Sequence, residues 1–268
     1  MASGNSAMIL ETGAGWTRGL RNLLRGELGS WFGTRAWLVQ ILIWFGSVNL
    51  IYLMTAFSSR GAGIDSTLIF NIFMGLVAPI GVTIVMQNEI VGEKRSGTAA
   101  WLLSKPVARP SFILAKLIAN TTGLLVTMVI AQGIIAYLIT GLVVGTWLPV
   151  VGFAAALAAH FANVLFYLTL TLMLGVLFEH PAPVIAIPMA FLFAQNFVGP
   201  KLAELSPALA DVLPWTLAIP LNGSVGQLSV SMALMAGQPT PLTAIWVALG
   251  ASALFVAVAL LVFRRQEL

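Results

Sequence analysis

Six long apolar stretches constrain this chain more than any other feature of its sequence. A helix of about 20 apolar residues crosses the roughly 30 Å hydrocarbon core of a bilayer with every backbone polar group paired inside the helix. Of the 268 residues, 59% are hydrophobic and only 8% are charged, too few charges to cover a soluble domain. We therefore expect an all-α membrane protein with six transmembrane helices. They are predicted at 36–57, 67–87, 113–140, 148–178, 183–199 and 242–263.

The basic residues predict how these six helices are oriented. Because the number of spans is even, both termini lie on the same side, and we place them in the cytoplasm. Of the 13 Lys and Arg residues, only Arg60 and Lys201 then fall outside the cell. Cytoplasmic loops of membrane proteins carry such an excess of positive charge. The sequence thus predicts a multi-pass protein of the cytoplasmic membrane, and its net charge of +4 reflects this orientation rather than nucleic-acid binding.

The region before the first apolar stretch divides into two parts. Residues 1–15 are small, polar and Gly-rich, so we expect them to be disordered. In 16–35, bulky apolar residues recur at helical spacing with arginines between them. This pattern predicts an amphipathic helix in the cytoplasmic interface, with its apolar face toward the membrane and its Arg face toward lipid headgroups. The six-span domain then occupies 36–268.

The segment 200–241 is the longest connection between the predicted spans, and it is rich in proline. Its middle, from Leu213 to Met235, is too apolar for a loop in water. We expect short extracellular or re-entrant helices that dip into the outer leaflet or cover the outer mouth, with their backbone covered by protein.

The sequence shows no pattern typical of an enzyme. Because it has no Cys and only two isolated His residues, thiol chemistry, disulfides and Cys-type zinc sites are excluded. The stretch 92–97 has neither the spacing nor the context of a phosphate-binding loop. We expect no enzymatic activity, no cofactor and no metal on this chain.

The cytoplasmic connection between the second and third spans holds most of the charge outside the N-terminal helix. Glu89 and Glu93 lie one helical turn apart, and Gly97 offers a helix stop. A second short helix, containing Trp101, must end or bend at Pro106. Such an element suits docking into a partner, although a solvated connector explains the charges equally well. The residues expected at a partner contact are Glu89, Glu93, Lys94, Arg95, Gly97, Thr98, Lys105 and Arg109.

The run from Glu89 to Lys116 resembles the permease subunits of the ATP-binding-cassette type-2 family. In that family an acidic and basic helix is followed by Gly-Thr, two or three leucines, Ser-x-Pro-Val-x-Arg and a Lys that opens the third span. The residues matching this pattern are Gly97, Thr98, Leu102, Leu103, Ser104, Pro106, Val107, Arg109 and Lys116. The Arg-rich N-terminal helix, the six spans and the closing segment 263–268 are also similar, whereas 1–15 and 200–241 depart from the family.

This resemblance implies a permease that has no ATPase of its own. Two permeases, identical or paralogous, would bind two cytosolic ATPase subunits that hold ATP and Mg²⁺, with 89–111 as the coupling helix. The family leans toward export. The alternative is an ATP-independent secondary transporter or a membrane scaffold. Secondary transporters usually place ionisable residues near the bilayer midplane, and none of the nine acidic residues is clearly at that depth.

Polar residues within the spans are the candidates for lining a transport pathway, because polar groups are costly in lipid and tend to face a partner or a pathway. Hydrogen bonding between helices explains such residues at least as well. The candidates are Asn71, Asn120, Thr121, His160, Asn163, Gln195 and Asn196.

Overall fold

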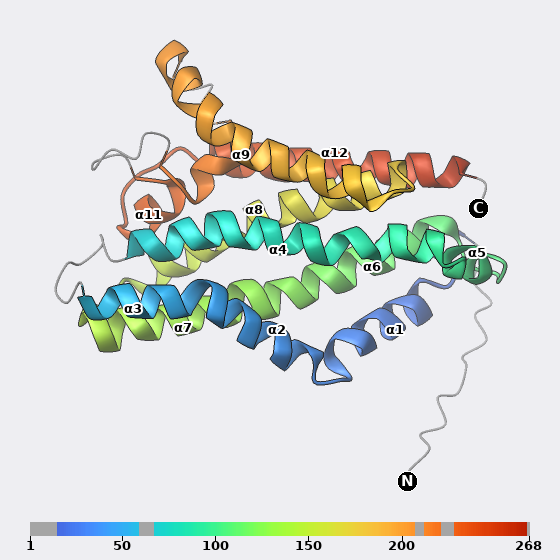
Figure 1. The fold of residues 1–268 in the computed structure, drawn as a ribbon, viewed down its shortest axis with the longest axis horizontal. Coiled ribbons are helices and arrows are strands. Elements are labelled where there is room, and N and C mark those ends of the chain that lie inside the picture. Colours follow the sequence, from blue (N-terminus) through green and yellow to red (C-terminus); the bar gives the residue numbers. More distant parts are fainter. Residues whose placement is uncertain (1–14, 59–66, 207–211, 221–227, 267–268) are drawn as a thin grey trace, which may run out of the picture.

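The computed structural model describes residues 15–58, 67–206, 212–220 and 228–266, and within these ranges all regular structure is helical (Figure 1). Six helical runs are long and apolar enough to cross a membrane, so the predicted all-helical architecture with six such helices is confirmed. They are Ala36–Ser58, Thr67–Arg95, Arg109–Val144, Val150–Leu177, Pro181–Leu202 and Thr243–Arg265. The predicted disorder of 1–15 falls, apart from Gly15, outside the described residues.

The six long helices lie side by side along the longest axis of the molecule (Figure 1). The start of α1 (Leu20–Phe32), all of α5 (Thr98–Leu103) and the last turns of α12 (Thr243–Arg265) lie at one end, which we call the α5 end. At the opposite end, the α11 end, lie α3 (Leu50–Ser58), α7 (Ala131–Ile139) and α11 (Val230–Met235). The remaining long helices are α4 (Thr67–Arg95), α6 (Arg109–Leu124), α8 (Val150–Leu177) and α9 (Pro181–Leu205).

α8 is the central helix of the bundle. It packs against α4, α9, α11 and α12, and most of its side chains from Phe153 to Val176 are buried. A helix that is apolar around its whole circumference suits such a position, because it has no polar face to turn outward. α12 contacts α8 along one side only and leaves Trp246, Leu254 and Leu261 exposed. These exposed side chains face lipid or another protein.

The first and third spans are interrupted by π-helical turns. α2 (Ala36–Trp44) continues through the π-helical η1 (Phe45–Asn49) into α3, while η3 (Leu125–Ile130) and η4 (Thr140–Val144) flank α7. The side chains of Asn49 and Gln132 join the two spans: Asn49 Nδ2 donates to Gln132 Oε1 at 2.7 Å. Gln132 Nε2 in turn donates to the Thr127 carbonyl inside η3, at 3.1 Å. Gln132 thus bonds both to the backbone of the π-helical turn and to Asn49 on the first span.

The helix α1 covers most of the predicted amphipathic segment 16–35, but it packs against protein. Leu23, Leu24 and Leu28 contact the hydrophobic core, while Arg21 and Arg25 are exposed. The Trp31 indole lies on α6 over Gly123, where a Cβ atom would come within 2.3 Å of the ring. We expected the apolar face of this helix to face the membrane. In the structure, the apolar face of α1 is turned at least partly toward the bundle.

The segment after the fifth span folds back onto the bundle in its described parts. η5 (Pro214–Leu217) and α11 are buried, as expected for an apolar segment whose backbone must be covered by protein. α9 continues through Pro188 and Pro200 to Leu205, beyond the end predicted at 199. Its last turns leave the bundle (Figure 1).

Candidate functional site

The connection between α4 and α6 is a helix-break-helix element, as its sequence predicts. α4 ends at Arg95, and Gly97 adopts a left-handed conformation with φ +74°. Glycine enters this region without the steric penalty that a Cβ atom brings, so it can end one helix and begin the next. α5 then ends before Pro106, and α6 begins at Arg109.

α5 has one fixed face and one exposed face. Ala99 is buried and the side chains of Leu102 and Leu103 pack against the core. On the other side, Trp101 is 61% exposed. The Lys105 ammonium lies 3.4 Å from the centre of the Trp101 ring, a cation–π arrangement that holds both side chains at the surface.

A buried lysine on α6 forms ion pairs with three carboxylates from two other helices. Lys116 Nζ on α6 lies 3.0 Å from Glu27 Oε1 on α1, and 3.2 Å and 2.7 Å from the carboxylates of Glu89 and Glu93 on α4. Asn120 Nδ2 donates to Glu89 Oε2 at 3.3 Å. We call these five residues the Lys116 cluster. Because the Lys116 side chain is only 3% exposed, the cluster joins three helices through one buried charge.

The same site is extended toward α1 by the indole of Trp31. Trp31 Nε1 donates to Asn120 Oδ1 at 3.1 Å. Two further bonds tie the segment before α1 to the connection: the Ala108 amide donates to the Arg18 carbonyl at 3.0 Å, and Ser111 Oγ donates to the Trp16 carbonyl at 3.0 Å. The N-terminal segment, α5 and the start of α6 therefore form one connected unit.

Two basic residues that the sequence assigned to a partner contact instead close helix ends within the chain. Lys94 Nζ donates to the carbonyls of Gly175 and Val176 at the end of α8. Arg109 Nη1 donates to the Arg264 carbonyl at 3.0 Å and to the carbonyl of Gln266, at the end of α12. The last carbonyls of a helix lack intrahelical partners and carry its negative dipole end, so cations suit this position.

The other predicted contact residues divide between the cluster and the surface. Glu89 and Glu93 are half-buried in the Lys116 cluster, whereas Arg95, Gly97, Thr98 and Lys105 are exposed. The exposed surface around α5 therefore includes two basic residues, Arg95 and Lys105, and the aromatic Trp101. Trp101 was not among the predicted contact residues.

The predicted pathway residues lie in separate places rather than along one pathway. Asn71 Oδ1 accepts from Ser231 Oγ at 2.6 Å and pairs with His160 Nε2 at 2.9 Å, near the α11 end. Gln195 Nε2 donates to the Tyr167 hydroxyl at 2.9 Å. Of the others, Asn120 belongs to the Lys116 cluster, Thr121 lines a groove between α6 and α12, Asn163 is buried on α8, and Asn196 is exposed on α9.

Sequence reasoning did not connect Glu27 with Lys116, because 89 residues separate the two. The available signal was Lys116 itself, a lysine inside a predicted span. Such a charge needs a carboxylate or another polar partner inside the membrane protein. Glu89 and Glu93, one helical turn apart just after the predicted second span, were the obvious partners, but the third carboxylate, Glu27, comes from α1.

Comparison with known proteins identifies the family but no characterised relative. No curated protein matches this chain. One family model matches residues 36–268, a range that includes all six long helices. The chain therefore belongs to DUF2705, a family of proteins of unknown function.

Proposed function

We propose that this chain is the permease subunit of an ATP-binding-cassette exporter in the cytoplasmic membrane, driven by a separate ATPase. The observation that carries this proposal is the rigid attachment of α5 to the rest of the α5 end. An element that receives force from a motor protein needs an exposed face for the partner and stiff connections to the helices that move. α5 has both.

The connections reach five other helices. α5 is joined covalently to α4 and α6, and the Lys116 cluster ties both of these to α1. Lys94 on α4 binds the end of α8, and Arg109 on α6 binds the end of α12. A displacement of α5 would therefore be transmitted to α1, α8 and α12 through charge-assisted hydrogen bonds, which are about twice as strong as neutral ones.

The exposed residues on and beside α5 define the chemistry of the expected partner surface. Trp101, Lys105 and Arg95 present an aromatic ring and two positive charges. Trp and Arg are enriched among residues that contribute most to binding at protein interfaces. We infer that the ATPase receives α5 in a groove with acidic residues at its rim. ATP-driven closure of the ATPases then shifts the permease between two conformations, because the two states make different contacts with α5.

A second permease copy has a suitable surface on α9. Four alanines at intervals of four residues lie exposed along this helix: Ala182, Ala186, Ala190 and Ala194. Residues four apart share one face of a helix, and small side chains there let two membrane helices approach closely. We propose that the two copies pack along this face.

The experiment is purification of the tagged chain from membranes in a mild detergent. We expect a soluble ATPase to co-purify with the wild type and to be lost with the double variant Arg95→Glu and Trp101→Ala. Both residues lie on the exposed face, so the fold should persist. Lys201→Glu, on the exposed part of α9, is the control and should retain the ATPase.

Two results would contradict the proposal. One is recovery of the wild-type chain with no ATPase while its own fold remains intact. The other is equal ATPase recovery with the double variant. The first result would favour a secondary transporter or a scaffold.

A further inference from the structure

α1 and the turn before it present a row of arginines on the side that faces away from the bundle. Arg21 and Arg25 lie four residues apart and therefore share one face of the helix. Both are exposed, and Arg18 in the turn before α1 is exposed as well. On the other side of the helix, Leu23 and Trp31 pack against the bundle. We call the three arginines the arginine face.

The arginine face has no counter-charge within the described part of the chain. None of its three side chains forms an ion pair with a described residue. Within 15–32 the only acidic residue is Glu27, which points to the bundle and pairs with Lys116. Arg21 does not stabilise α1 itself, because positive charge in the first turn of a helix opposes the helix dipole. The positive charge of this face is therefore available to a partner outside the chain.

The position of α1 along the chain places the arginine face at the depth of lipid headgroups. α1 ends at Phe32, and the first membrane-spanning run begins at Ala36. Figure 1 shows α1 at the edge of the bundle, running from the α5 end to the turn that leads into α2. A basic helix directly beside a span lies in the interfacial region, where anionic headgroups attract it. The three arginines thus lie where headgroups are, next to the first span.

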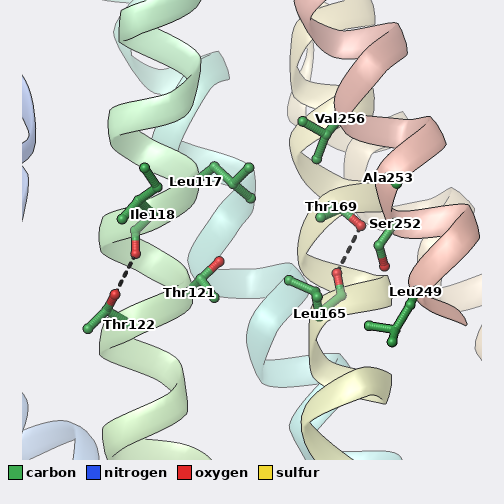
Figure 2. Close-up of a pocket in the computed structure, with 10 residues that line it drawn as sticks. All are labelled: Leu117, Ile118, Thr121, Thr122, Leu165, Thr169, Leu249, Ser252, Ala253 and Val256. Carbon is green, nitrogen blue, oxygen red and sulfur yellow. Dashed lines mark hydrogen bonds between the residues drawn. The ribbon is translucent and has the colours of Figure 1, made fainter. Parts of the chain in front are cut away.

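Apolar surface follows the arginine face along the chain. Phe32 at the end of α1 is exposed, and α2 exposes Leu38, Val39, Leu42 and Ile43. A surface that changes from arginine to aromatic to aliphatic matches a phospholipid, in which acyl chains follow a phosphate headgroup. The groove between α6, α8 and α12 lacks the first part of this sequence, because no charged residue lines it (Figure 2).

We propose that the arginine face binds the headgroup of an anionic phospholipid whose acyl chains lie against the apolar surface of α2. Guanidinium groups bind phosphate oxygens through paired, charge-assisted hydrogen bonds. A zwitterionic lipid binds less tightly, because its positively charged group meets three like charges and no described carboxylate on this face. The lipid thus supplies the counter-charge that the described chain does not. This site does not depend on the proposed permease function.

Native mass spectrometry of the whole chain in a mild detergent tests the site. The probes are phosphatidylglycerol and phosphatidylcholine with identical acyl chains. We expect the first phosphatidylglycerol to bind about tenfold or more tightly than phosphatidylcholine. Arg21→Gln together with Arg25→Gln should weaken phosphatidylglycerol binding by about tenfold or more, because each arginine near an anionic surface contributes roughly fivefold. Phosphatidylcholine binding should change little.

Two exposed arginines on another helix provide a matched control. Arg264→Gln together with Arg265→Gln removes the same charge from the same end of the molecule, on α12. This variant should bind phosphatidylglycerol within about twofold of the wild type. The Arg21 and Arg25 variant should also keep the wild-type unfolding midpoint in detergent alone, because both side chains are exposed.

Four results would overturn the proposal. The first is equal affinity of the wild type for the two lipids. The second is the same loss of phosphatidylglycerol binding in both double variants, which would indicate general charge attraction. The third is displacement of the lipid by inorganic phosphate, which would indicate a site for a soluble anion. The fourth is unchanged lipid binding in the Arg21 and Arg25 variant. If that variant also lost a co-purifying ATPase, its arginines would belong to the contact with that protein.

Discussion

Lys116 is a charged residue at a position where most spans are apolar, and its surroundings explain how it is tolerated. Three carboxylates lie within 3.2 Å of its ammonium group, so the cluster has more negative than positive charge. The Lys116 side chain is 3% exposed, whereas those of Glu27, Glu89 and Glu93 are 25–27% exposed. The carboxylates retain contact with solvent or lipid headgroups. The charge of Lys116 is therefore balanced only by these carboxylates, whereas each carboxylate is stabilised partly by Lys116 and partly by its exposed surroundings.

This asymmetry predicts unequal effects of substitution. Lys116→Met should lower the free energy of unfolding by about 3–5 kcal/mol, because it leaves three neighbouring carboxylates without their counter-charge. Glu93→Gln should cost clearly less, since two carboxylates still balance Lys116. The unfolding midpoint in detergent checks both, with Lys201→Met at an exposed site as the control. A Lys116→Met variant as stable as Glu93→Gln would contradict this account of the cluster.

Residue roles at the α5 end were only partly predictable from the sequence. The sequence correctly predicted the charged connection and the helix stop at Gly97, because both depend only on neighbouring residues. It assigned Lys94 and Arg109 to a partner, although the structure uses them on the ends of α8 and α12. Which carbonyls a cation reaches is decided by how distant helices meet, and no local pattern contains that information.

At the scale of elements, the helix boundaries that the sequence predicted correctly are set by local backbone preferences. Those that it missed are set by packing between helices. Gly97 and Pro106 separate α4, α5 and α6 as their backbone preferences require. α9 passes through Pro188 and Pro200, although proline usually ends a helix. Membrane helices tolerate internal proline where neighbouring groups satisfy the backbone. The π-helical turns of the first and third spans likewise have no signature in the sequence.

The contact between the start of α6 and the end of α12 gives an element-scale prediction. Arg109→Ala removes the guanidinium that binds the carbonyls of Arg264 and Gln266. We expect the last turn of α12 to fray, with amide hydrogen exchange at 262–266 faster by about tenfold, because a charge-assisted hydrogen bond contributes about 1.5–3 kcal/mol. Arg95→Ala, which removes an exposed arginine of the same end, should leave exchange at 262–266 unchanged. Equal exchange in both variants would show that Arg109 does not stabilise this terminus.

For the molecule as a whole, the central question is which end faces the cytoplasm. The α5 end carries Arg95, Lys105, Arg264 and Arg265 as exposed basic residues, so by the positive-inside rule we expect this end to face the cytoplasm. The α11 end is closed by the buried η5 and α11 and exposes Gln238 beyond them. Force from an ATPase is available only on the cytoplasmic side, so the permease proposal requires this orientation.

Because the sequence contains no Cys, single cysteines can test the orientation without any background. Ser104→Cys places a thiol on the exposed surface at the α5 end, and Gln238→Cys places one at the α11 end. With a membrane-impermeant maleimide on intact cells, we expect Gln238→Cys to react and Ser104→Cys to react only after permeabilisation. The reverse pattern would put α5 outside the cell, out of reach of any ATP-hydrolysing partner. The arrangement around Lys116 would then have to be explained as purely structural.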